Sequence, residues 1–431
     1  MEVSTETIEE KVFKDPVHKY IHVNDTLIWD LINTREFQRL RRIRQLGTTY
    51  MTFHGAEHSR FSHSLGVYEI TRKIISQFER SRYPDWPAEE RMLCLCAALL
   101  HDVGHGPFSH SIEPVFEVDH EYWTCEIILG QTEINRVLRR AGDDFPKRVA
   151  DVIRKDYSQE IVVHLISSQL DADRMDYLLR DAFFTGVSYG TFDLDRILRV
   201  IRPHKGHIVI KESGMHAVEH YLMSRYQMYW QVYFHPVTRS SEIILRHILK
   251  RAKALHHEGY AFQFLLEPLP ALFEGRLTMA EYLMLDESFM QMTLMRWTME
   301  KDEILADLCD RFLNRKLFKY VELESQAEEL VDLVRRDMVK AGLDPDYYLE
   351  IDFPSDLPYD VYQPGKMTGK APILLLSDSG QIREISEKSE VVRSISGVHK
   401  GNYKLYYPRE WLLERSACLS NETRSLLNLG P

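Results

Sequence analysis

Apolar residues recur at helical spacing through most of the first 340 residues of the chain. Helical segments are expected at roughly 59–81, 88–102, 120–140, 160–184, 214–256 and 279–342. Ahead of them, residues 11–24 contain valines, aromatic residues and an Asp-Pro turn, which predicts a hairpin. From Asp25 the pattern becomes helical, and Gly47 provides a stop signal.

The pattern changes near residue 343, where proline, tyrosine and aspartate become frequent. Residues 371–386 alternate around a Ser-Asp-Ser-Gly turn, as a β-hairpin does. We therefore expect a mainly α fold, a helical bundle with a smaller α+β C-terminal part. The expected divisions are 1–50, 51–260, 261–345 and 346–431.

Composition and charge narrow the class of protein. The formal net charge of −11 argues against binding of bulk nucleic acid, because that requires a positive surface. The five cysteines are few, odd in number and mostly in apolar patterns, which indicates reduced thiols. The N-terminus is acidic and polar, unlike a targeting peptide, and no apolar run approaches the length of a membrane span. These features predict a cytoplasmic protein without a membrane partner.

Residues 99–110 read LLHDVGHGPFSH and follow an apolar core helix. The helix delivers His101 and Asp102 at its C-terminal end, and Gly104 is expected to end it. His105 then falls on a turn instead of one helical turn beyond His101. Burying a titratable pair without partners is costly, and a bound metal would remove that cost.

Two other helical segments carry suitable metal ligands. His63 shares a helical face with inward-facing apolar residues, and Asp171, Asp173 and Asp176 lie in another apolar-periodic helix. Together they suggest a mixed nitrogen and oxygen site for a divalent metal. Taken singly, His63 is also typical of a hydrogen-bonded core histidine, and the aspartates of a charged helix face.

The order His63 … His101-Asp102 … Asp173 resembles the H…HD…D signature of the HD-domain metal-dependent phosphohydrolases. The stretches FQRLRRIRQLG, RFSHSLGVYE, DADRMDYLLRD and YQMYWQVYFHP are similar to the deoxynucleoside triphosphate (dNTP) triphosphohydrolase branch, which includes the vertebrate SAM-and-HD-domain enzyme. The resemblance covers roughly residues 11–260 and implies an HD catalytic core at 51–260. It also implies hydrolysis of a dNTP to a deoxynucleoside and intact triphosphate.

The resemblance also implies roles for individual residues. The implied metal ligands are His63, His101, Asp102 and Asp173, holding Mn, Fe, Mg, Zn or Ni, which the sequence does not distinguish. The implied catalytic residues are His105, His110 as general acid, Glu113 as its orienting carboxylate, His120, and Glu121 as the residue that orients His120. The implied sugar-binding residues are Gln45, Tyr177, Asp181 and Tyr233. Arg60 stands one helical turn before His63 and Arg174 directly follows Asp173, so we expect both to contact a phosphate beside the metal, although an arginine at either position is also typical of a surface ion pair.

Residues 35–44 carry five arginines in an acidic protein. With Phe37, Leu40 and Ile43 inward, we expect Arg39, Arg41, Arg42 and Arg44 to face outward as a positive patch. The resemblance implies a homotetramer with an activator nucleotide between subunits. The implied contacts are Lys11, Val12, Lys14, Asn33 and Arg41, all within residues 1–50. Asn33 stands where the vertebrate enzyme has a guanine-reading aspartate.

Two other functions stay open from the sequence. One is an HD-family phosphohydrolase or phosphodiesterase that acts on another nucleotide. The other is a non-catalytic nucleotide-sensing protein that keeps the fold.

Overall fold

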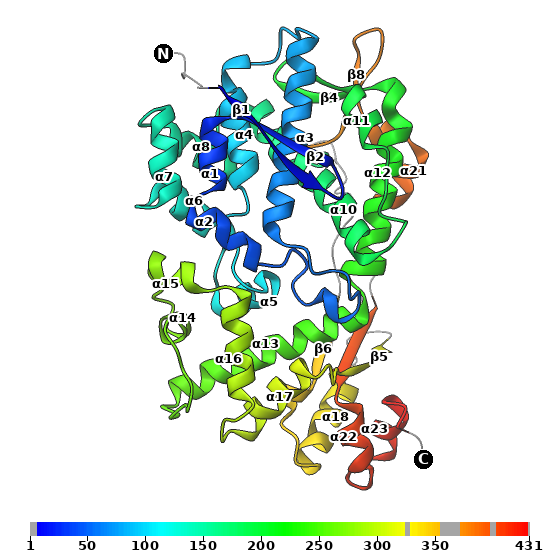
Figure 1. Cartoon of the computed structure of the whole chain (residues 1–431). Coiled ribbons are helices and arrows are strands. Elements are labelled where there is room, and N and C mark those ends of the chain that lie inside the picture. The colour runs from blue at the N-terminus through cyan, green and yellow to red at the C-terminus, as the bar shows by residue number, and fades with distance from the viewer. Residues whose placement is uncertain (1–6, 324–327, 354–370, 397–401, 430–431) are drawn as a thin grey trace.

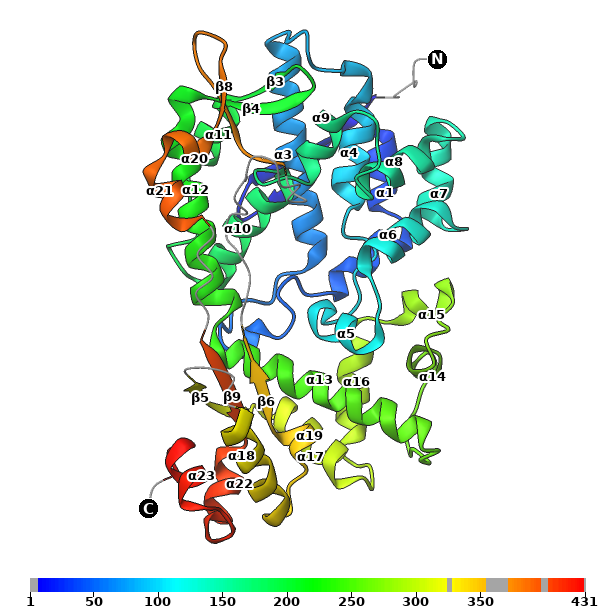
Figure 2. The same ribbon diagram turned by 180° about the vertical axis from the view of Figure 1, so that it is seen from behind.

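The computed structural model describes residues 7–323, 328–353, 371–396 and 402–429. Helices dominate, and three small sheets accompany them (Figures 1 and 2). The expected mainly α class is confirmed. Among the described residues, none of the helices combines the length and apolar character that a bilayer crossing requires.

The expected N-terminal hairpin is present and lies across a long central helix (Figure 1). Strand β1 (Thr7–Asp15) pairs antiparallel with β2 (Lys19–Asp25), and β2 contacts α3 (Arg60–Arg80). The helical stretch after Asp25 is broken into α1 (Thr26–Ile32), α2 (Arg35–Arg39) and a 3-10 turn, η1 (Leu40–Arg42). The break has a local cause, because Thr34 caps α2 by accepting from the backbone N–H of Phe37.

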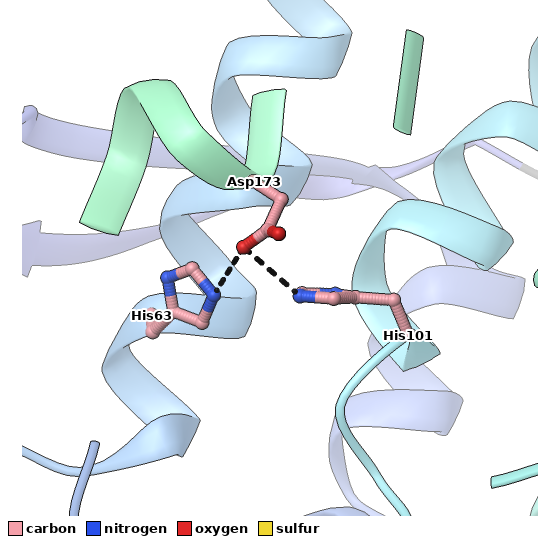
Figure 3. Close-up of side chains that lie close together, drawn as sticks. All are labelled: His63, His101 and Asp173. Atoms are coloured by element: carbon pink, nitrogen blue, oxygen red, sulfur yellow. Dashed lines mark ion pairs between the residues drawn. The ribbon is translucent and has the colours of Figure 1, made fainter. Parts of the chain in front are cut away.

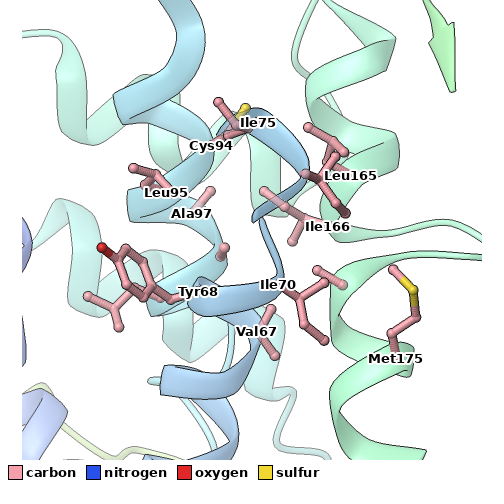
Figure 4. Close-up of a cluster of buried hydrophobic side chains, with 14 of the residues drawn as sticks. Val67, Tyr68, Ile70, Ile75, Cys94, Leu95, Ala97, Leu165, Ile166 and Met175 are labelled. Carbon is pink, nitrogen blue, oxygen red and sulfur yellow. The ribbon is translucent and has the colours of Figure 1, made fainter. Parts of the chain in front are cut away.

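The bundle packs around α3 and α4 (Arg91–Leu100). Figure 4 shows Val67 and Ile70 of α3 facing apolar residues of α4, α9 (Glu160–Ile166) and α10 (Ala172–Thr185). Leu95, Leu165 and Met175 from these helices are at most 1% exposed. This core fixes α3, α4 and α10 relative to one another.

Several of the long helical segments are interrupted. Segment 120–140 divides at Gly130 into α6 (His120–Leu129) and α7 (Glu133–Leu138), and segment 160–184 divides into α9 and α10. Segment 214–256 becomes α12 (Met215–Met228), a π turn, η6 (Tyr229–Tyr233), and α13, which begins at Pro236. Proline suits a first helical position but lacks the N–H needed inside a helix.

Segment 279–342 contains a strand that the periodicity did not predict. It divides into α15 (Met279–Met284), α16 (Glu287–Trp297), α17 (Glu303–Leu313), β5 (Lys319–Leu323) and α18 (Glu328–Lys340).

The other helices are α5 (Ser109–Phe116), α8 (Phe145–Ile153), α11 (Leu194–Val200), α13 (Pro236–His257), α14 (Leu269–Phe273), α19 (Pro345–Tyr348), α20 (Ile385–Lys388), α21 (Glu390–Ile395), α22 (Arg409–Glu414) and α23 (Asn421–Leu426).

The segments after residue 345 pack in two different places. The expected hairpin, β7 (Leu374–Leu376) and β8 (Ile382–Glu384), extends a sheet begun by β3 (Ile201–His204) and β4 (His207–Lys211). Strand β9 (Tyr403–Tyr407) instead joins β5 and β6 (Glu350–Asp352) at the other end of the molecule (Figures 1 and 2). The boundary at 345 stays a prediction, although both sheets cross it.

Candidate active site

His63, His101 and Asp173 meet at the centre of the bundle (Figure 3). His63 comes from α3, His101 from the end of α4 and Asp173 from the first turn of α10. The Nε2 atoms of His63 and His101 lie 3.1 Å and 3.6 Å from Asp173 Oδ1. Asp102 also faces them, with its oxygens 3.7 Å from His63 Nε2 and 3.3 Å from His101 Nε2.

The two imidazoles are oriented toward one point by their other ring nitrogens. His63 Nδ1 lies 2.8 Å from Asp176 Oδ2, and His101 Nδ1 lies 2.9 Å from the carbonyl oxygen of Ala98. These acceptors leave both Nε2 atoms free to offer a lone pair, as in metal-binding histidines. Apart from their ion pairs with Asp173 and Asp102, both buried Nε2 atoms have no hydrogen-bond partner among the described residues. The arrangement fits a divalent metal, whose identity the donor set leaves open.

Electrostatics at these residues also suit a cation. Burial lowers the pKa of His63, but Asp173, Asp176 and Asp102 outweigh it and raise that pKa to about 10 without a metal. Burial would raise the pKa of Asp173, but His101 and His63 hold it below its usual range. The carboxylates are therefore ionised and concentrate negative charge beside the two imidazoles.

Asp102 joins this cluster to Arg60 and His105. Arg60 donates to Asp102 Oδ2 at 2.5 Å, and His105 Nε2 lies 3.2 Å from Asp102 Oδ1. Burial would raise the pKa of Asp102, but His101, His105 and Arg60 hold it well below its ordinary value. Ligation of a metal by Asp102 stays a prediction, since one of its oxygens already accepts from Arg60.

His105 and His120 stack beside the cluster, with ring centroids 3.9 Å apart and planes 14° from parallel. Glu113 Oε1 lies 2.9 Å from His120 Nδ1 and 3.9 Å from His105 Nδ1. Burial and the charge of Arg60 keep the pKa of His105 well below its ordinary value. Burial also lowers the pKa of His120, but the hydrogen bond to Glu113 and the charge of Asp102 raise it overall. His105 is therefore neutral, whereas His120 holds a proton more readily than an ordinary histidine.

Gly104 allows this stack to form by its lack of a side chain. A Cβ at Gly104 would lie 2.1 Å from the backbone nitrogen of Thr124 and 2.4 Å from the carbonyl oxygen of His120. Helix α6 can therefore approach closely and bring His120 beside His105. The predicted role of Gly104 as the helix stop is wrong, because α4 already ends at Leu100 with His101 as its C-cap residue.

The Glu121 side chain lies away from the stack of His105 and His120. Glu121 accepts from Lys155 Nζ at 2.7 Å, so the carboxylate that holds His120 is Glu113 and not the expected Glu121. Adjacent helical residues point about 100° apart, which explains why Glu121 faces away from the ring of His120. His110 lies in α5, but its side chain is outside the described part of the structure.

A cleft of about 420 Å³ opens from this cluster. Its lining includes four residues of the metal and histidine cluster, Asp102, His105, His120 and Asp173, together with the predicted phosphate contact Arg60 and the four predicted sugar contacts Gln45, Tyr177, Asp181 and Tyr233. The volume lies within the range typical of small-molecule sites. The cleft thus joins the predicted phosphate and sugar contacts in one space.

The side of the cleft that carries the predicted sugar contacts is organised around Asp181. Tyr233 donates to Asp181 Oδ2 at 2.7 Å, and His58 Nε2 lies 2.8 Å from Asp181 Oδ1. Tyr177 meets Tyr233 edge to face. Gln45 Oε1 is buried with no hydrogen-bond partner among the described residues, so it can accept from a ligand. His58 was not predicted, although it stands close to His63 in the same EHSRFSH stretch.

Arg174 is held by a neighbouring carboxylate. It donates to Asp171 Oδ2 at 3.1 Å and is not among the residues that line the cleft. Its Nε is buried without a hydrogen-bond partner in the described structure. A phosphate contact by Arg174 therefore stays a prediction, whereas Arg60 already lies at the cleft.

The expected outward arginine patch is wrong for Arg39. Arg39 is 2% exposed and donates to the carbonyl oxygens of Leu285 and His105. Arg39 is the last residue of α2, and its guanidinium is buried because segments distant in sequence supply these carbonyl acceptors. Arg42 is exposed, as expected, and Arg44 is partly buried; they form ion pairs with Asp286 and Glu287, respectively.

The other predicted activator contacts lie near the surface. Arg41 is exposed, with its guanidinium carbon 3.6 Å from the centroid of the Phe61 ring. Val12 and Lys14 are exposed on β1, and Lys14 donates to the hydroxyl of Tyr20 at 3.1 Å. Lys11 is half-buried on β1. Asn33 is exposed at the end of α1, where its side-chain amide donates to the carbonyl oxygen of Trp29.

Comparison with known proteins extends these observations. Residues 60–258 match the HD domain family. The uncharacterized protein YwfO of Bacillus subtilis is 60% identical over 411 residues, which cover 94% of each chain. The deoxynucleoside triphosphate triphosphohydrolase SAMHD1 of Danio rerio is 27% identical over 291 residues, which cover 58% of this chain and 46% of that protein. The crystal structure of a phosphohydrolase from Bacteroides thetaiotaomicron superposes with a TM-score of 0.80 at 27% identity, covering 93% of this chain and 100% of that chain.

Proposed function

This chain belongs to the HD-domain family of metal-dependent phosphohydrolases, and we propose that it hydrolyses a dNTP to a deoxynucleoside and inorganic triphosphate. One observation carries the proposal above others. A single cleft has a metal-ligand cluster with Arg60 and two histidines on one side, and an Asp181–Tyr233 pair on the other. That distribution suits a ligand with a polyanionic end and a hydroxyl-bearing end. The similarity to SAMHD1 supports the same substrate class.

The phosphate side supplies charge and a proton. A divalent metal held by His63, His101 and Asp173 would polarise a phosphoryl oxygen and lower the pKa of a bound water. Arg60 is placed to neutralise charge on the phosphates, which is a large part of catalysis of phosphoryl transfer. His120, with its raised pKa, holds a proton toward the phosphates, and neutral His105 stacks against it.

In the proposed reaction, water forms a bond to the α-phosphorus and the bond from that phosphorus to the 5′-oxygen breaks. The departing 5′-oxygen takes up a proton, and triphosphate leaves intact. His110 is the predicted donor of this proton. Glu113 is placed to tune the histidines, because its carboxylate lies near both His105 and His120.

The sugar side would select the deoxyribose. The Asp181 carboxylate can accept a hydrogen bond from a 3′-hydroxyl, and the buried Gln45 carbonyl oxygen can accept another. A tyrosine ring packed against C2′ would leave no room for a ribose hydroxyl, and Tyr177 is placed in the cleft for this role. Discrimination by a polar or filled pocket can reach several orders of magnitude.

The decisive experiment is product analysis. The protein loaded with Mn²⁺, Mg²⁺, Zn²⁺, Fe²⁺ or Ni²⁺ is incubated with each dNTP and each rNTP, and phosphate, pyrophosphate and triphosphate are separated by ion chromatography. Triphosphate with an equal amount of deoxynucleoside is the expected result. Release of monophosphate or hydrolysis of cyclic nucleotides alone would favour another HD phosphohydrolase.

Two controls separate enzyme from contaminant and from a non-catalytic sensor. Asp173→Asn removes a carboxylate ligand and is expected to abolish hydrolysis, whereas Glu121→Gln removes a surface carboxylate that pairs with Lys155. Equal activity in the unmodified protein, Asp173→Asn and Glu121→Gln would indicate a contaminating enzyme. Nucleotide binding without any turnover would instead favour a nucleotide-sensing protein.

Regulation and assembly form a separate part of the proposal. Lys11, Val12, Lys14, Asn33 and Arg41 are proposed to contact an activator nucleotide between subunits of a homotetramer. Support comes from their placement near the surface of the hairpin and the α1–η1 segment. Sedimentation with and without dNTPs tests assembly, and initial rates on one dNTP with a second one added test activation. A linear response unaffected by any second dNTP would exclude activation.

A further inference from the structure

A second group of metal-ligating side chains lies on a different part of the molecule. Glu160 and His164 stand one turn apart on α9, and His207 stands at the start of β4. One potential ligand atom from each of the three lies within 4.8 Å of the others. The group shares no residue with the site formed by His63, His101 and Asp173.

The spacing is close to that of a bound metal. Two ligands held at about 2.0–2.1 Å around a tetrahedral ion stand about 3.3 Å apart. Glu160 Oε2 lies 3.4 Å from His207 Nδ1. The rings of His164 and His207 are 21° from parallel, with centroids 6.4 Å apart. All three ligand atoms lie within 4.8 Å of one another, so binding of one ion requires the side chains to move closer together.

From this geometry we propose that Glu160, His164 and His207 form a second divalent-cation site, suited to a borderline ion such as Zn²⁺. Two imidazoles and one carboxylate are a common donor set for such ions. The hard ions Mg²⁺ and Ca²⁺ prefer oxygen ligands and fit less well. Because the group lies at the surface, water completes the coordination.

The scaffold holds the ligands in advance. Helix α9 packs directly against β4, and residues four apart on a helix lie on one face. The side chains of His207 and Glu160 are 44% and 65% exposed. Binding is therefore reversible and weaker than in a closed structural site.

The site has two consequences for the protein. A bound ion would join α9 to the β3–β4 hairpin and stabilise the folded chain by mass action. It would also add a second ion per chain to any metal analysis, separate from the ion at His63, His101 and Asp173. Metal content alone would then overstate occupancy of the catalytic site.

Zn²⁺ titration of the full chain against a chromophoric chelator tests the site. The background is Asp173→Ala, which removes a ligand from the first site. We expect this variant still to bind one Zn²⁺ per chain. Adding His207→Ala abolishes that binding, and adding Glu160→Gln weakens it by at least about tenfold, because one ligand is lost.

His216→Ala is the matched control. His216 is another exposed histidine, paired with Glu219 at 2.6 Å, and it belongs to none of the potential metal groups among the described residues. We expect His216→Ala in the Asp173→Ala background to bind Zn²⁺ as its parent does. Zn²⁺ should also raise its Tm, because the bound ion stabilises the folded chain. Unchanged binding in the His207→Ala or Glu160→Gln protein would reduce the group to an ion pair and overturn the proposal. Circular dichroism of each variant confirms that it is folded.

Discussion

His18 Nε2, in the turn of the N-terminal hairpin, lies 2.6 Å from Asp176 Oδ1. The other oxygen of that carboxylate lies 2.8 Å from His63 Nδ1, so one side chain connects the hairpin to a metal ligand. Arg180 donates to Asp176 and also to Asp15, whose carboxylate holds the turn through the N–H groups of Val17 and His18. All of these charged side chains are buried. The hairpin that carries the proposed activator contacts thus packs against Asp176, the residue that orients His63.

His18→Ala should weaken metal binding at the first site. The substitution removes one partner of Asp176 and loosens the carboxylate that orients His63. Loss of the direct partner of a metal-binding histidine typically costs about 10-fold to 100-fold in affinity, and His18 acts one contact further out, through Asp176, so we expect a smaller loss. Metal affinity is measured by equilibrium dialysis with Mn²⁺, alongside kcat and KM.

His22→Ala is the matched control for His18→Ala. His22 lies on the same hairpin, but its side chain is partly exposed and pairs with Glu10. We expect its Mn²⁺ affinity to equal that of the unmodified protein. If His18→Ala and His22→Ala bind Mn²⁺ equally well, the hairpin does not support the site.

Gly66→Ala should destabilise the protein strongly. A Cβ at Gly66 would lie 1.8 Å from Asp176 Oδ1 and 2.5 Å from Arg180. Both of those side chains are fully buried in the network and cannot move aside freely. Disruption of such a network costs about 3 kcal/mol or more. Thermal unfolding checks this against Ser76→Ala on the same helix, which should shift Tm little.

Glu113→Gln should move the pH profile of hydrolysis. Glu113 raises the pKa of His120 through a hydrogen bond and its negative charge, so removing the charge lowers that pKa. If protonated His120 contacts the phosphates, activity is lost as His120 deprotonates. The alkaline limb of the pH profile of Glu113→Gln therefore shifts to lower pH. The apparent pKa comes from kcat/KM measured across pH at saturating metal.

Glu121→Gln separates the two carboxylates near His120. Glu121 pairs with Lys155 and not with His120, so its removal should leave the pH profile in place. A shift with Glu121→Gln and none with Glu113→Gln would reverse the assignment made from the geometry.

Local patterns predicted much of the fold and of the metal cluster. The hairpin, α3 and α4 follow from alternation and helical spacing, and the inward face of α3 correctly carried His63 into the core. The β3–β4 hairpin was missed, although Lys205 and Gly206 take the positive φ angles of a tight turn. Its short strands lie between helices and gave a weak signal.

The errors arose where side chains depend on elements distant in sequence. Helical phase placed Arg39 outward, but Leu285, from a segment distant in sequence, supplies a buried acceptor for it. Sequence adjacency suggested Glu121 as the partner of His120, whereas Glu113 reaches it from α5. Periodicity within one segment carries no information about such contacts between segments.

Tyr177→Ala should relax discrimination between dNTPs and rNTPs. Tyr177 lines the cleft, and its ring meets the edge of Tyr233, which is bonded to Asp181. Removing the ring creates space where a 2′-hydroxyl would lie, so the ratio of kcat/KM for an rNTP to that for its dNTP should rise by about tenfold or more. Tyr177→Phe keeps the ring and should retain the discrimination of the unmodified protein. If the ratio stays constant in Tyr177→Ala while triphosphate release continues, the sugar is selected elsewhere in the cleft.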